Sequence, residues 1–416
     1  MTDRVGEASR GPSLSVVIPT RNRHEYAASC IASLLRIPSR DLEIIVQDNS
    51  DSDELGPLLQ QRAPDDRLHY AHRPGRLSVI DNCNHAMARA SGEYVTLLGD
   101  DDGVNPEIME ATSWARENEV DALIPSLSAY YYWPDVRYKY YGARWAATLV
   151  VKRFSGTIVE QDVEAGVRAS ARFAFQNLVD CVSLPKLYYG IIRRQCLERL
   201  YQATGAYFHG VSPDMGAAIG LSGFVRRAYA VDYPLFVPGT SARSTAGAGA
   251  QKKHVGRLED QPHLPVDCAS DWPATVPAFF AVQTVWAQSA IAALRATGRE
   301  GVLRDFDMAL LHGMCAVFNP GYWRSTVHNY YRALRLTGQS VIGGTLKLAR
   351  GVAFTWRLRA VTLLRRLARS PSHTPAYAQS GLGNIDAAVL ALSTYLRDSG
   401  RRFIGSAAAP PAPANR

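Results

Sequence analysis

The chain has 416 residues, of which 47% are hydrophobic and 20% charged, and its formal net charge is +8. These proportions are typical of a folded globular chain with room for two or more domains, and they exclude a disordered or fibrous protein. The six cysteines are scattered without a C-x-x-C pair, which excludes a zinc ribbon and a disulfide framework and predicts reduced thiols in a cytoplasmic protein.

The two ends of the chain are polar or of low complexity. Residues 1–12 carry no apolar run, so we expect a flexible N-terminus and no signal peptide. Residues 405–416 are rich in Ala and Pro and are predicted to be disordered. No segment reaches about 18 uncharged apolar residues, so no transmembrane helix is expected.

The segment from residue 13 to residue 126 alternates between two kinds of apolar pattern. Such alternation predicts an α/β fold with a largely parallel sheet covered by helices on both faces. The predicted strands are 13–19, 41–48, 67–72, 92–99 and 121–126, and the predicted helices are 25–37, 53–62, 77–90 and 106–118.

The pattern changes in the second half of the chain. Residues 128–145 are dense in aromatic side chains, which suits either the lining of an acceptor site or a tyrosine-rich strand pair packed on the core. From about residue 275 the spacing of apolar residues predicts helices. Their expected ranges are 277–298, 299–318, 324–338 and 343–370.

Three consecutive carboxylates, Asp100, Asp101 and Asp102, follow the predicted strand 92–99. In an open α/β sheet, ligands bind where strands end. Hard oxygen ligands of this kind suit Mg²⁺ or Mn²⁺, and either ion can hold a diphosphate. The alternative is an acidic turn ahead of the next helix, which Asn105-Pro106-Glu107 would begin.

Together, LSVVIPTRNR, VQDNS and SVIDNCNHAMARASGEYVTLLGDDD resemble, in that order, the family 2 glycosyltransferases of the GT-A fold. The resemblance covers about residues 12–126. It implies a GT-A catalytic domain over 13–260, followed by a helical C-terminal region over 275–400. It also implies inverting transfer of a sugar from a nucleotide-diphosphate sugar to a glycan or lipid-linked acceptor in cell-surface polysaccharide assembly. The Q-x-x-R-W element of processive members is missing, so we expect transfer of one or a few sugars.

The resemblance also implies roles for individual residues. A divalent metal, Mn²⁺ or Mg²⁺, is expected on Asp102, with His254 as a further ligand. Gln47 stands where the family more often has a second acid, so the contact to the base is expected to differ. The nucleotide-sugar contacts are expected from Pro19, Thr20, Arg21, Asn22, Asp48, Arg76, Asn82, Asp100 and Asp101.

The general base is expected later in the chain, at Asp214 in AYFHGVSPDMGAAIGLS. Family members carry an acid there, although Pro213 replaces the glutamate that often precedes it. A proline followed by an acid is also an ordinary helix start, and Asp180 is a competing base. The loop 238–254 is rich in Gly, Ala and Ser and is either a cover over the donor or a solvated surface loop.

Positive charge is concentrated in one region of the chain. Between Met308 and Ile385 there are ten Lys or Arg and no Asp or Glu, so this stretch contributes +10 and the remainder carries −2. Within it, residues 346–369 interleave cations with Trp and Phe, which suits an anionic membrane surface. A homo-oligomer interface is the main alternative, and no nucleic acid is expected because no binding motif accompanies the charge.

Two other functions compete with glycosyl transfer. A nucleotidyltransferase also combines an α/β sheet with acidic metal ligands, but it would need a glycine-rich phosphate loop, and PTRNRHEY has no glycine. A non-catalytic sugar-nucleotide-binding scaffold is disfavoured by the intact candidates for metal ligand, base and ribose contact.

Overall fold

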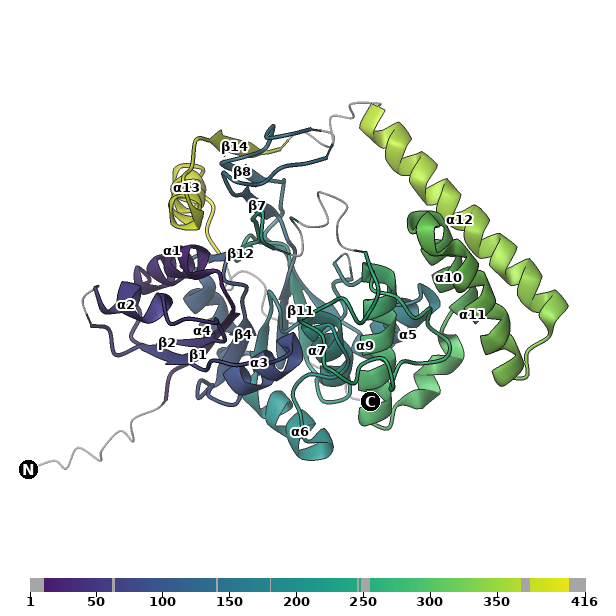
Figure 1. Cartoon of the computed structure of the whole chain (residues 1–416). Helices are drawn as coiled ribbons and strands as arrows, with labels where there is room; N and C mark the ends of the chain where they lie inside the picture. The colour runs from purple at the N-terminus through teal and green to yellow at the C-terminus, as the bar shows by residue number, and fades with distance from the viewer. Residues whose placement is uncertain are drawn as a thin grey trace, which may run out of the picture.

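The computed structural model describes residues 11–61, 64–139, 141–179, 181–244, 247, 255–367 and 375–403. Its centre is an eight-stranded sheet in the order β3-β2-β1-β4-β10-β6-β11-β9 (Figure 1). Strands β10 and β9 are antiparallel to their neighbours and the other six are parallel. The strands are β1 (Leu14–Thr20), β2 (Leu42–Asp48), β3 (Leu68–His72), β4 (Tyr94–Leu97), β6 (Ala122–Pro125), β9 (Ile158–Gln161), β10 (Ile191–Arg193) and β11 (Ala228–Val231).

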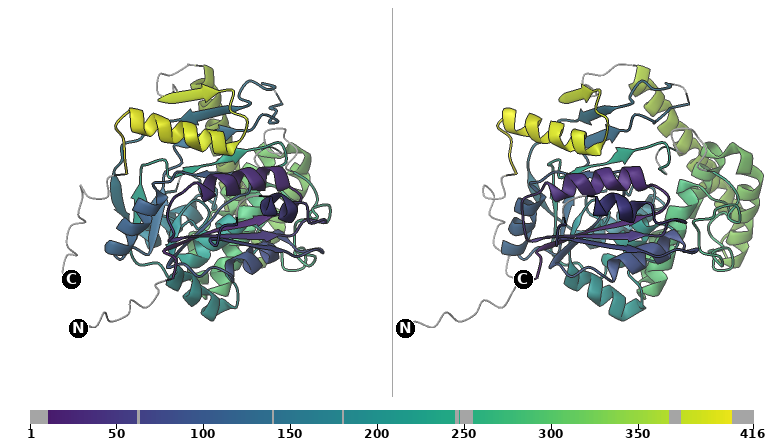
Figure 2. Two further views of the ribbon diagram at one scale, coloured as in Figure 1. Left: turned by 90° about the vertical axis from the view of Figure 1, so that its left-hand side faces the viewer. Right: turned by 60° about the vertical axis from the view of Figure 1, so that its left-hand side comes forward.

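Helices cover both faces of this sheet, because alternate strand residues are apolar on both sides. Val16 and Ile18 of β1 pack into one core and Val17 into the other. Figure 2 shows α1 on one side of the sheet and α6 on the other. The predicted α/β class is therefore confirmed. The first layer contains α1 (His24–Leu35), α2 (Leu55–Gln60) and α4 (Ile108–Glu117), and the second contains α3 (Val79–Met87), α5 (Val163–Arg172), α6 (Arg194–Thr204) and α7 (Pro213–Leu221).

Two smaller sheets close over the carboxyl ends of the central strands. The tyrosine-rich segment forms β7, which pairs antiparallel with β8 and buries Tyr131, as expected for a strand pair packed on the core. Strand β13 brings the chain back beside β7, next to the acidic run. The smaller strands are β5 (Gly103–Val104), β7 (Ala129–Tyr132), β8 (Thr148–Val151), β12 (Phe236–Val237), β13 (Gly239–Thr240) and β14 (Tyr377–Ser380).

The C-terminal region is mainly helical, as predicted. Helix α9 begins later than the sequence indicates, because Phe280 is extended and pairs with Gly256. The long helix α12 packs along α10 and α11 and forms one edge of the molecule (Figure 1). The elements are α9 (Val282–Ala296), α10 (Met308–Phe318), α11 (Trp323–Leu336), α12 (Val341–Leu367) and α13 (Ile385–Asp398), with short 3-10 turns at Glu300–Asp305 and Pro320–Tyr322.

The last described elements return to the N-terminal half. Strand β14 pairs with β8, and α13 lies over α1 (Figure 2). Ile385 and Val389 of α13 pack so closely on Gly103 that a Cβ atom there would lie 2.6 Å from Val389. The far end of the predicted helical region thus supports the turn that carries the acidic run. None of the described helices has both the length and the apolar composition needed to cross a membrane.

Candidate active site

A pocket of about 570 Å³ opens where β1 and β4 end, between the acidic run and helices α7 and α9. Asp100, Asp101 and Asp102 line it together with Asp214. Asp214 is more than a hundred positions from the acidic run in sequence, and the fold brings both to one cavity. The position at the carboxyl ends of parallel strands is where α/β sheets bind ligands.

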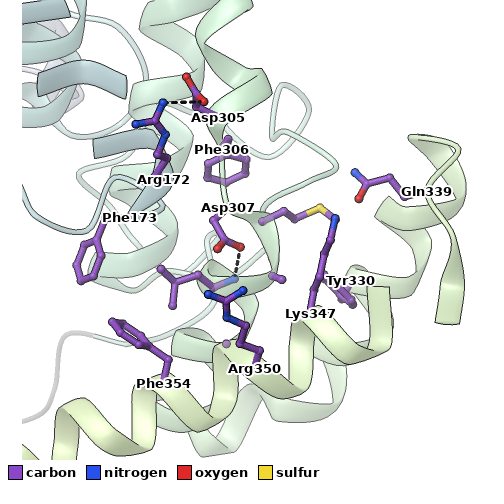
Figure 3. Close-up of a pocket in the computed structure, with 14 residues that line it drawn as sticks. Arg172, Phe173, Asp305, Phe306, Asp307, Tyr330, Gln339, Lys347, Arg350 and Phe354 are labelled. Carbon is purple, nitrogen blue, oxygen red and sulfur yellow. Dashed lines mark hydrogen bonds and ion pairs between the residues drawn. The ribbon is translucent and has the colours of Figure 1, made fainter. Parts of the chain in front are cut away.

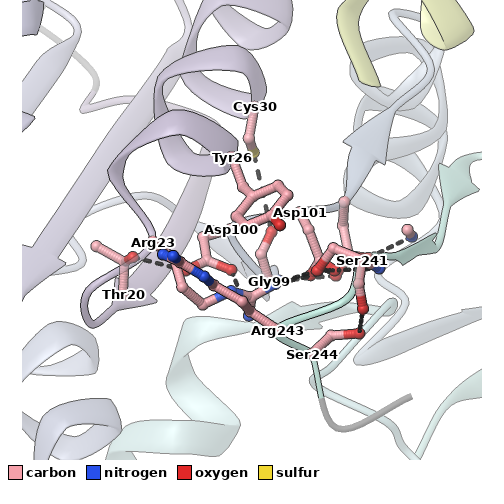
Figure 4. Close-up of polar contacts among 12 residues, drawn as sticks. Thr20, Arg23, Tyr26, Cys30, Gly99, Asp100, Asp101, Ser241, Arg243 and Ser244 are labelled. Carbon is pink, nitrogen blue, oxygen red and sulfur yellow. Dashed lines mark hydrogen bonds and ion pairs between the residues drawn. The ribbon is translucent and has the colours of Figure 1, made fainter. Parts of the chain in front are cut away.

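Arg23, in the turn before α1, pairs with the acidic run (Figure 4). Its Nη1 lies 2.7 Å from Oδ1 of Asp100, and its Nη2 lies 2.9 Å from Oδ2 of Asp101. Ser241 donates a second hydrogen bond to Asp101, at 2.7 Å. The backbone amide of Ser241 also donates to Oδ2 of Asp101, at 3.2 Å. Asp100 is held by side chains, Arg23 and Thr20, which can rotate away.

Asp102 is held differently, mainly by the backbone. Its Oδ1 accepts from the Gly239 amide at 2.6 Å, and its Oδ2 accepts from the Gly99 amide at 3.0 Å and from the Tyr188 hydroxyl at 2.9 Å. The amides are fixed by the strands and turns around them. Asp102 therefore joins the end of β4 to β13 and shapes the pocket floor.

The electrostatics of the run call for a cation. Burial raises the pKa of Asp100 to about 6, against the lowering effect of Arg23. Burial and the charge of Asp101 raise the pKa of Asp102 to about 7. Burial lowers the pKa of Arg23, but Asp100 and Asp101 outweigh it and raise that pKa overall. One guanidinium thus faces three buried carboxylates, and the local charge stays negative.

The residues of the run fit a divalent metal that takes its other ligands from water and phosphate. Among the described residues, no three His, Cys, Asp or Glu side chains converge as a closed metal site. Mg²⁺ is commonly bound through one or two carboxylates plus substrate phosphates. Asp100 can offer its Oδ1 when Arg23 moves, whereas Asp101 keeps its hydrogen bonds from Ser241 and Asp102 has both oxygens hydrogen-bonded to the protein. Metal ligation by Asp102 stays a prediction. His254 lies outside the described residues.

Asp214 lies in the first turn of α7, directly after Pro213. Burial raises the pKa of its carboxyl, in spite of hydrogen bonds from Ser212, the Met215 amide and Trp286. The helix-start interpretation is correct as a description of local structure. It does not compete with a role in the pocket, because the same side chain lines the cavity. Asp180, the competing base, lies outside the described residues.

Besides Asp100 and Asp101, three of the residues predicted to bind the nucleotide lie at or near the pocket. Pro19 lines it, and Thr20 donates a hydrogen bond of 2.6 Å to Oδ2 of Asp100. The amide of Asn82 donates to the Thr20 carbonyl at 3.3 Å, while its buried Oδ1 has no hydrogen-bond partner in the described structure. A ligand donor could satisfy that oxygen, because buried acceptors are normally paired.

The other predicted nucleotide contacts hold the protein's own loops. Arg21 forms an exposed ion pair with Asp51 at 3.2 Å. Asn22, at φ 54°, has its backbone amide on Ser50 and its side-chain amide on Asp51. Asp48 is buried and accepts from the Ser50 amide at 2.8 Å.

These contacts tie the end of β1 to the end of β2. Asp48 also accepts from the Tyr70 hydroxyl at 3.0 Å. Arg76 is exposed ahead of α3 and does not line the pocket. A nucleotide contact from Asp48 or from Arg76 stays a prediction.

Sequence reasoning missed the residues that hold the acidic run. Arg23 directly follows the P-T-R-N element, which was the one signal available for it. Tyr188 and Tyr189 enter from a loop before β10, and Tyr189 has a φ of 61°, which is unusual for a residue with a side chain. Gly239 lies in the loop 238–254 that the sequence indicates, but no sequence signal distinguishes it from the other glycines there.

The first part of the chain matches a known protein family. Residues 15–175 match the family model described as Glycosyl transferase family 2. The match covers β1–β4 and the acidic run, and it confirms the resemblance seen in the sequence. Together with the mainly parallel sheet, it confirms the expected GT-A class. It ends before Asp214.

Individual relatives match over short segments. A GalNAc(5)-diNAcBac-PP-undecaprenol beta-1,3-glucosyltransferase of Campylobacter jejuni is 39% identical over 93 residues, which is 22% of this chain and 30% of the relative. Glycosyltransferase GlyG of Streptococcus pneumoniae is 28% identical over 110 residues, 26% of this chain and 36% of the relative. The matches thus span about a third of these relatives' lengths.

A solved structure, mannosyltransferase PcManGT from Pyrobaculum calidifontis in complex with GDP-Man and Mn²⁺, aligns over 95% of this chain and 89% of its own. The identity is 16% and the TM-score 0.42.

Proposed function

We propose that this protein, whose residues 15–175 match the family model described as Glycosyl transferase family 2, transfers a sugar from a nucleotide-diphosphate sugar to a hydroxyl group of a glycan or lipid-linked acceptor. The observation that carries the proposal is the shared pocket of Asp100, Asp101, Asp102 and Asp214. A buried acidic run at a sheet edge and a separate buried carboxyl are what donor binding and acceptor activation require. Work on a bacterial surface glycan or glycolipid is part of the proposal, and the curated relatives' names support it.

The donor end of the site lies at the acidic run. Thr20, at the end of β1, and Asn82, in α3, would receive the nucleoside, since Thr20 contacts Asp100 and Asn82 contacts the Thr20 carbonyl. Arg23 is the cation nearest the run and can turn its guanidinium toward a diphosphate, for which its planar fork is well suited. A Mg²⁺ or Mn²⁺ held by Asp100 and Asp101 would neutralise charge on the leaving diphosphate.

The acceptor end lies at Asp214. Its raised pKa makes the ionised carboxylate a stronger base than a solvated aspartate, which suits removal of a proton from an attacking hydroxyl. The hydroxyl oxygen then forms a bond to the anomeric carbon while the bond to the diphosphate breaks. We propose attack from the face opposite the diphosphate, with inversion, as the resemblance to the family 2 glycosyltransferases implies.

We further propose that the protein works at the cytoplasmic face of a membrane. Helix α12 exposes large apolar side chains, among them Leu346 and Trp356, and no acid occurs between Met308 and Ile385. All six cysteines are free thiols, as in a reducing compartment. A lipid-linked acceptor would be presented at such a surface.

The test uses purified protein, a panel of nucleotide-diphosphate sugars and lipid-linked acceptors, with and without Mn²⁺. We expect one donor to raise the melting temperature in a metal-dependent manner and to release nucleoside diphosphate only when acceptor is present. A parallel assay supplies a nucleoside triphosphate and a sugar 1-phosphate, and release of inorganic pyrophosphate there would instead show a nucleotidyltransferase. Donor binding without turnover with any acceptor would support a scaffold and contradict the proposal.

A further inference from the structure

A second pocket, of about 480 Å³, lies between the end of α5, residues 305–310 and helix α12 (Figure 3). It shares no lining residue with the candidate active site. The glycosyl-transfer proposal gives it no role. Its walls combine cations with aromatic and aliphatic side chains, and this combination indicates the chemical class of a ligand.

The two acids of the pocket are already engaged by the protein. Asp305 accepts from Arg168 at 3.0 Å and from Arg172 at 3.3 Å. Asp307 is the N-cap of α10, and its Oδ1 accepts from the Leu310 amide at 2.8 Å. Both carboxylates are therefore bound to groups outside α12.

The cations of α12 have no such partner. Lys347 and Arg350 lie one turn apart on the helix, and Figure 3 shows both side chains directed into the pocket. Among the described residues, neither forms an ion pair. No acid occurs in α11, in α12 or in the turn between them. The pocket lining therefore has an excess of positive charge, with Arg172, Lys347 and Arg350 against Asp305 and Asp307.

One end of the pocket is apolar. Phe173 and Phe354 meet edge to face, with ring centroids 6.2 Å apart, and Met308 and Leu310 line the inner side. A small inorganic anion would leave this end unused. The combination fits a phosphate group that is attached to an apolar body.

The outer face of α12 indicates where such a molecule would come from. Ile342, Leu346 and Trp356 are 79%, 69% and 56% exposed, and at 100° per residue they fall on one stripe. Lys347 and Arg350 flank that stripe on one side. An exposed apolar stripe with Trp, bordered by cations, is the pattern of a helix that lies in a membrane interface.

We propose that this pocket binds the phosphate group of an anionic membrane lipid while the outer stripe of α12 rests in the bilayer surface. Lys347 and Arg350 bind the phosphate, and Phe173 and Phe354 contact the first carbons of the lipid body. This deepens the proposed function by naming the partner that holds the enzyme at its lipid-linked acceptor. Its test measures binding and needs no sugar transfer.

The experiment measures binding of dihexanoyl phosphatidic acid to the full chain by calorimetry, with dihexanoyl phosphatidylcholine and inorganic phosphate as separate ligands. The pocket variant is Lys347→Gln with Arg350→Gln. The matched control, Arg335→Gln with Arg357→Gln, removes the same charge from α11 and α12 outside the pocket. All four side chains are exposed, so both variants are expected to fold.

We expect the pocket variant to bind phosphatidic acid at least tenfold more weakly, and the control within twofold of the wild type. Phosphatidylcholine and inorganic phosphate should bind at least tenfold more weakly than phosphatidic acid. Equal losses in both variants would show diffuse surface charge and overturn the pocket site. If inorganic phosphate bound as tightly as phosphatidic acid, the claim that the ligand is a lipid would be overturned. The same would follow if the wild type and the control formed a dimer and the pocket variant did not. Sugar transfer to a water-soluble acceptor should be unchanged in the pocket variant, so the two proposals fail separately.

Discussion

The guanidinium of Arg23 lies 2.7 Å from the carboxylate of Asp100 and reaches Asp101 at the same time. The pair is largely buried, with the Arg23 side chain 20% exposed and that of Asp100 3%. Arg23 thus supplies the positive charge that makes three adjacent carboxylates tolerable at the end of β4. A metal that takes oxygens from Asp100 and Asp101 must compete with this guanidinium.

Arg23→Gln is therefore expected to destabilise the protein by about 3 kcal/mol, because removing one partner of a buried pair leaves uncompensated charge. Mn²⁺ should then raise the melting temperature of the variant more than that of the wild type, since no guanidinium competes. The control is Arg21→Gln, which removes an exposed ion pair two residues earlier and should cost less than about 0.5 kcal/mol. If Mn²⁺ stabilised the wild type and Arg23→Gln equally, the proposed competition between Mn²⁺ and the Arg23 guanidinium would be contradicted.

Gly239 is expected to be essential for the shape of the donor site. A Cβ atom at this position would lie 1.8 Å from the Asp101 carbonyl oxygen, so Gly239→Ala must push β13 away from the acidic run. Overpacking of this kind costs about 1–3 kcal/mol, and donor affinity should fall at least tenfold. Gly383→Ala is the control, because its Cβ would meet nothing within 4 Å. Both are measured by calorimetric titration with the donor, and unchanged affinity in Gly239→Ala would place the donor elsewhere.

The pH dependence of transfer should report Asp214. Burial raises its pKa above the usual aspartate value, and the carboxylate is the active form of a base. The rate should therefore fall as the pH drops through this raised pKa, at a higher pH than for a solvated aspartate. The measurement is kcat against pH at saturating donor, and a flat profile down to the ordinary aspartate pKa would exclude Asp214 as the base.

The same burial predicts a stability gain in Asp214→Asn. A carboxyl with a raised pKa in the folded state contributes its stability below the unfolded pKa and loses it as the pH rises through the folded pKa. At neutral pH the ionised group therefore opposes folding, and a neutral amide does not. The melting temperature of Asp214→Asn should exceed that of the wild type at pH 7 and converge with it at low pH.

Leu346→Ser tests the outer face of α12 in an independent way. If this face lies in a bilayer surface, loss of one largely exposed leucine should weaken binding to anionic vesicles about fivefold, from roughly 1 kcal/mol of lost apolar contact. Leu390→Ser on α13 is the control, since Leu390 is also exposed but lies away from α12. If both variants floated with vesicles equally well, the claim that α12 lies in the bilayer surface would be contradicted.

The central fold could be predicted because its signals are local. Strands β1 to β4 and their helices follow from apolar runs, and the acidic run could be placed at the end of β4. The link between Asp101 and Ser241 could not, because it joins residues 140 positions apart. The start of α9 was also misplaced, because the pairing of Phe280 with Gly256 overrides a helical pattern.

The candidate site was predictable in part for the same reason. Asp214 and the acidic run carry patterns that indicate chemistry, and they meet in one pocket. Metal binding by Asp102 stays a prediction. That its Oδ1 accepts from the Gly239 amide could not be predicted, because this contact depends on how β13 returns. Arg23 is one cation among many in the sequence, and only the fold shows that it faces Asp100.

The most direct measurement of the central claim compares wild type and Asp214→Asn in two assays, single-turnover transfer to acceptor and equilibrium binding of donor. We expect transfer to slow by about 10²–10⁴-fold, the usual contribution of a general base, while donor affinity stays within twofold. Transfer by Asp214→Asn within tenfold of the wild-type rate would contradict the account, and loss of rate in Asp180→Asn instead would move the base to that residue.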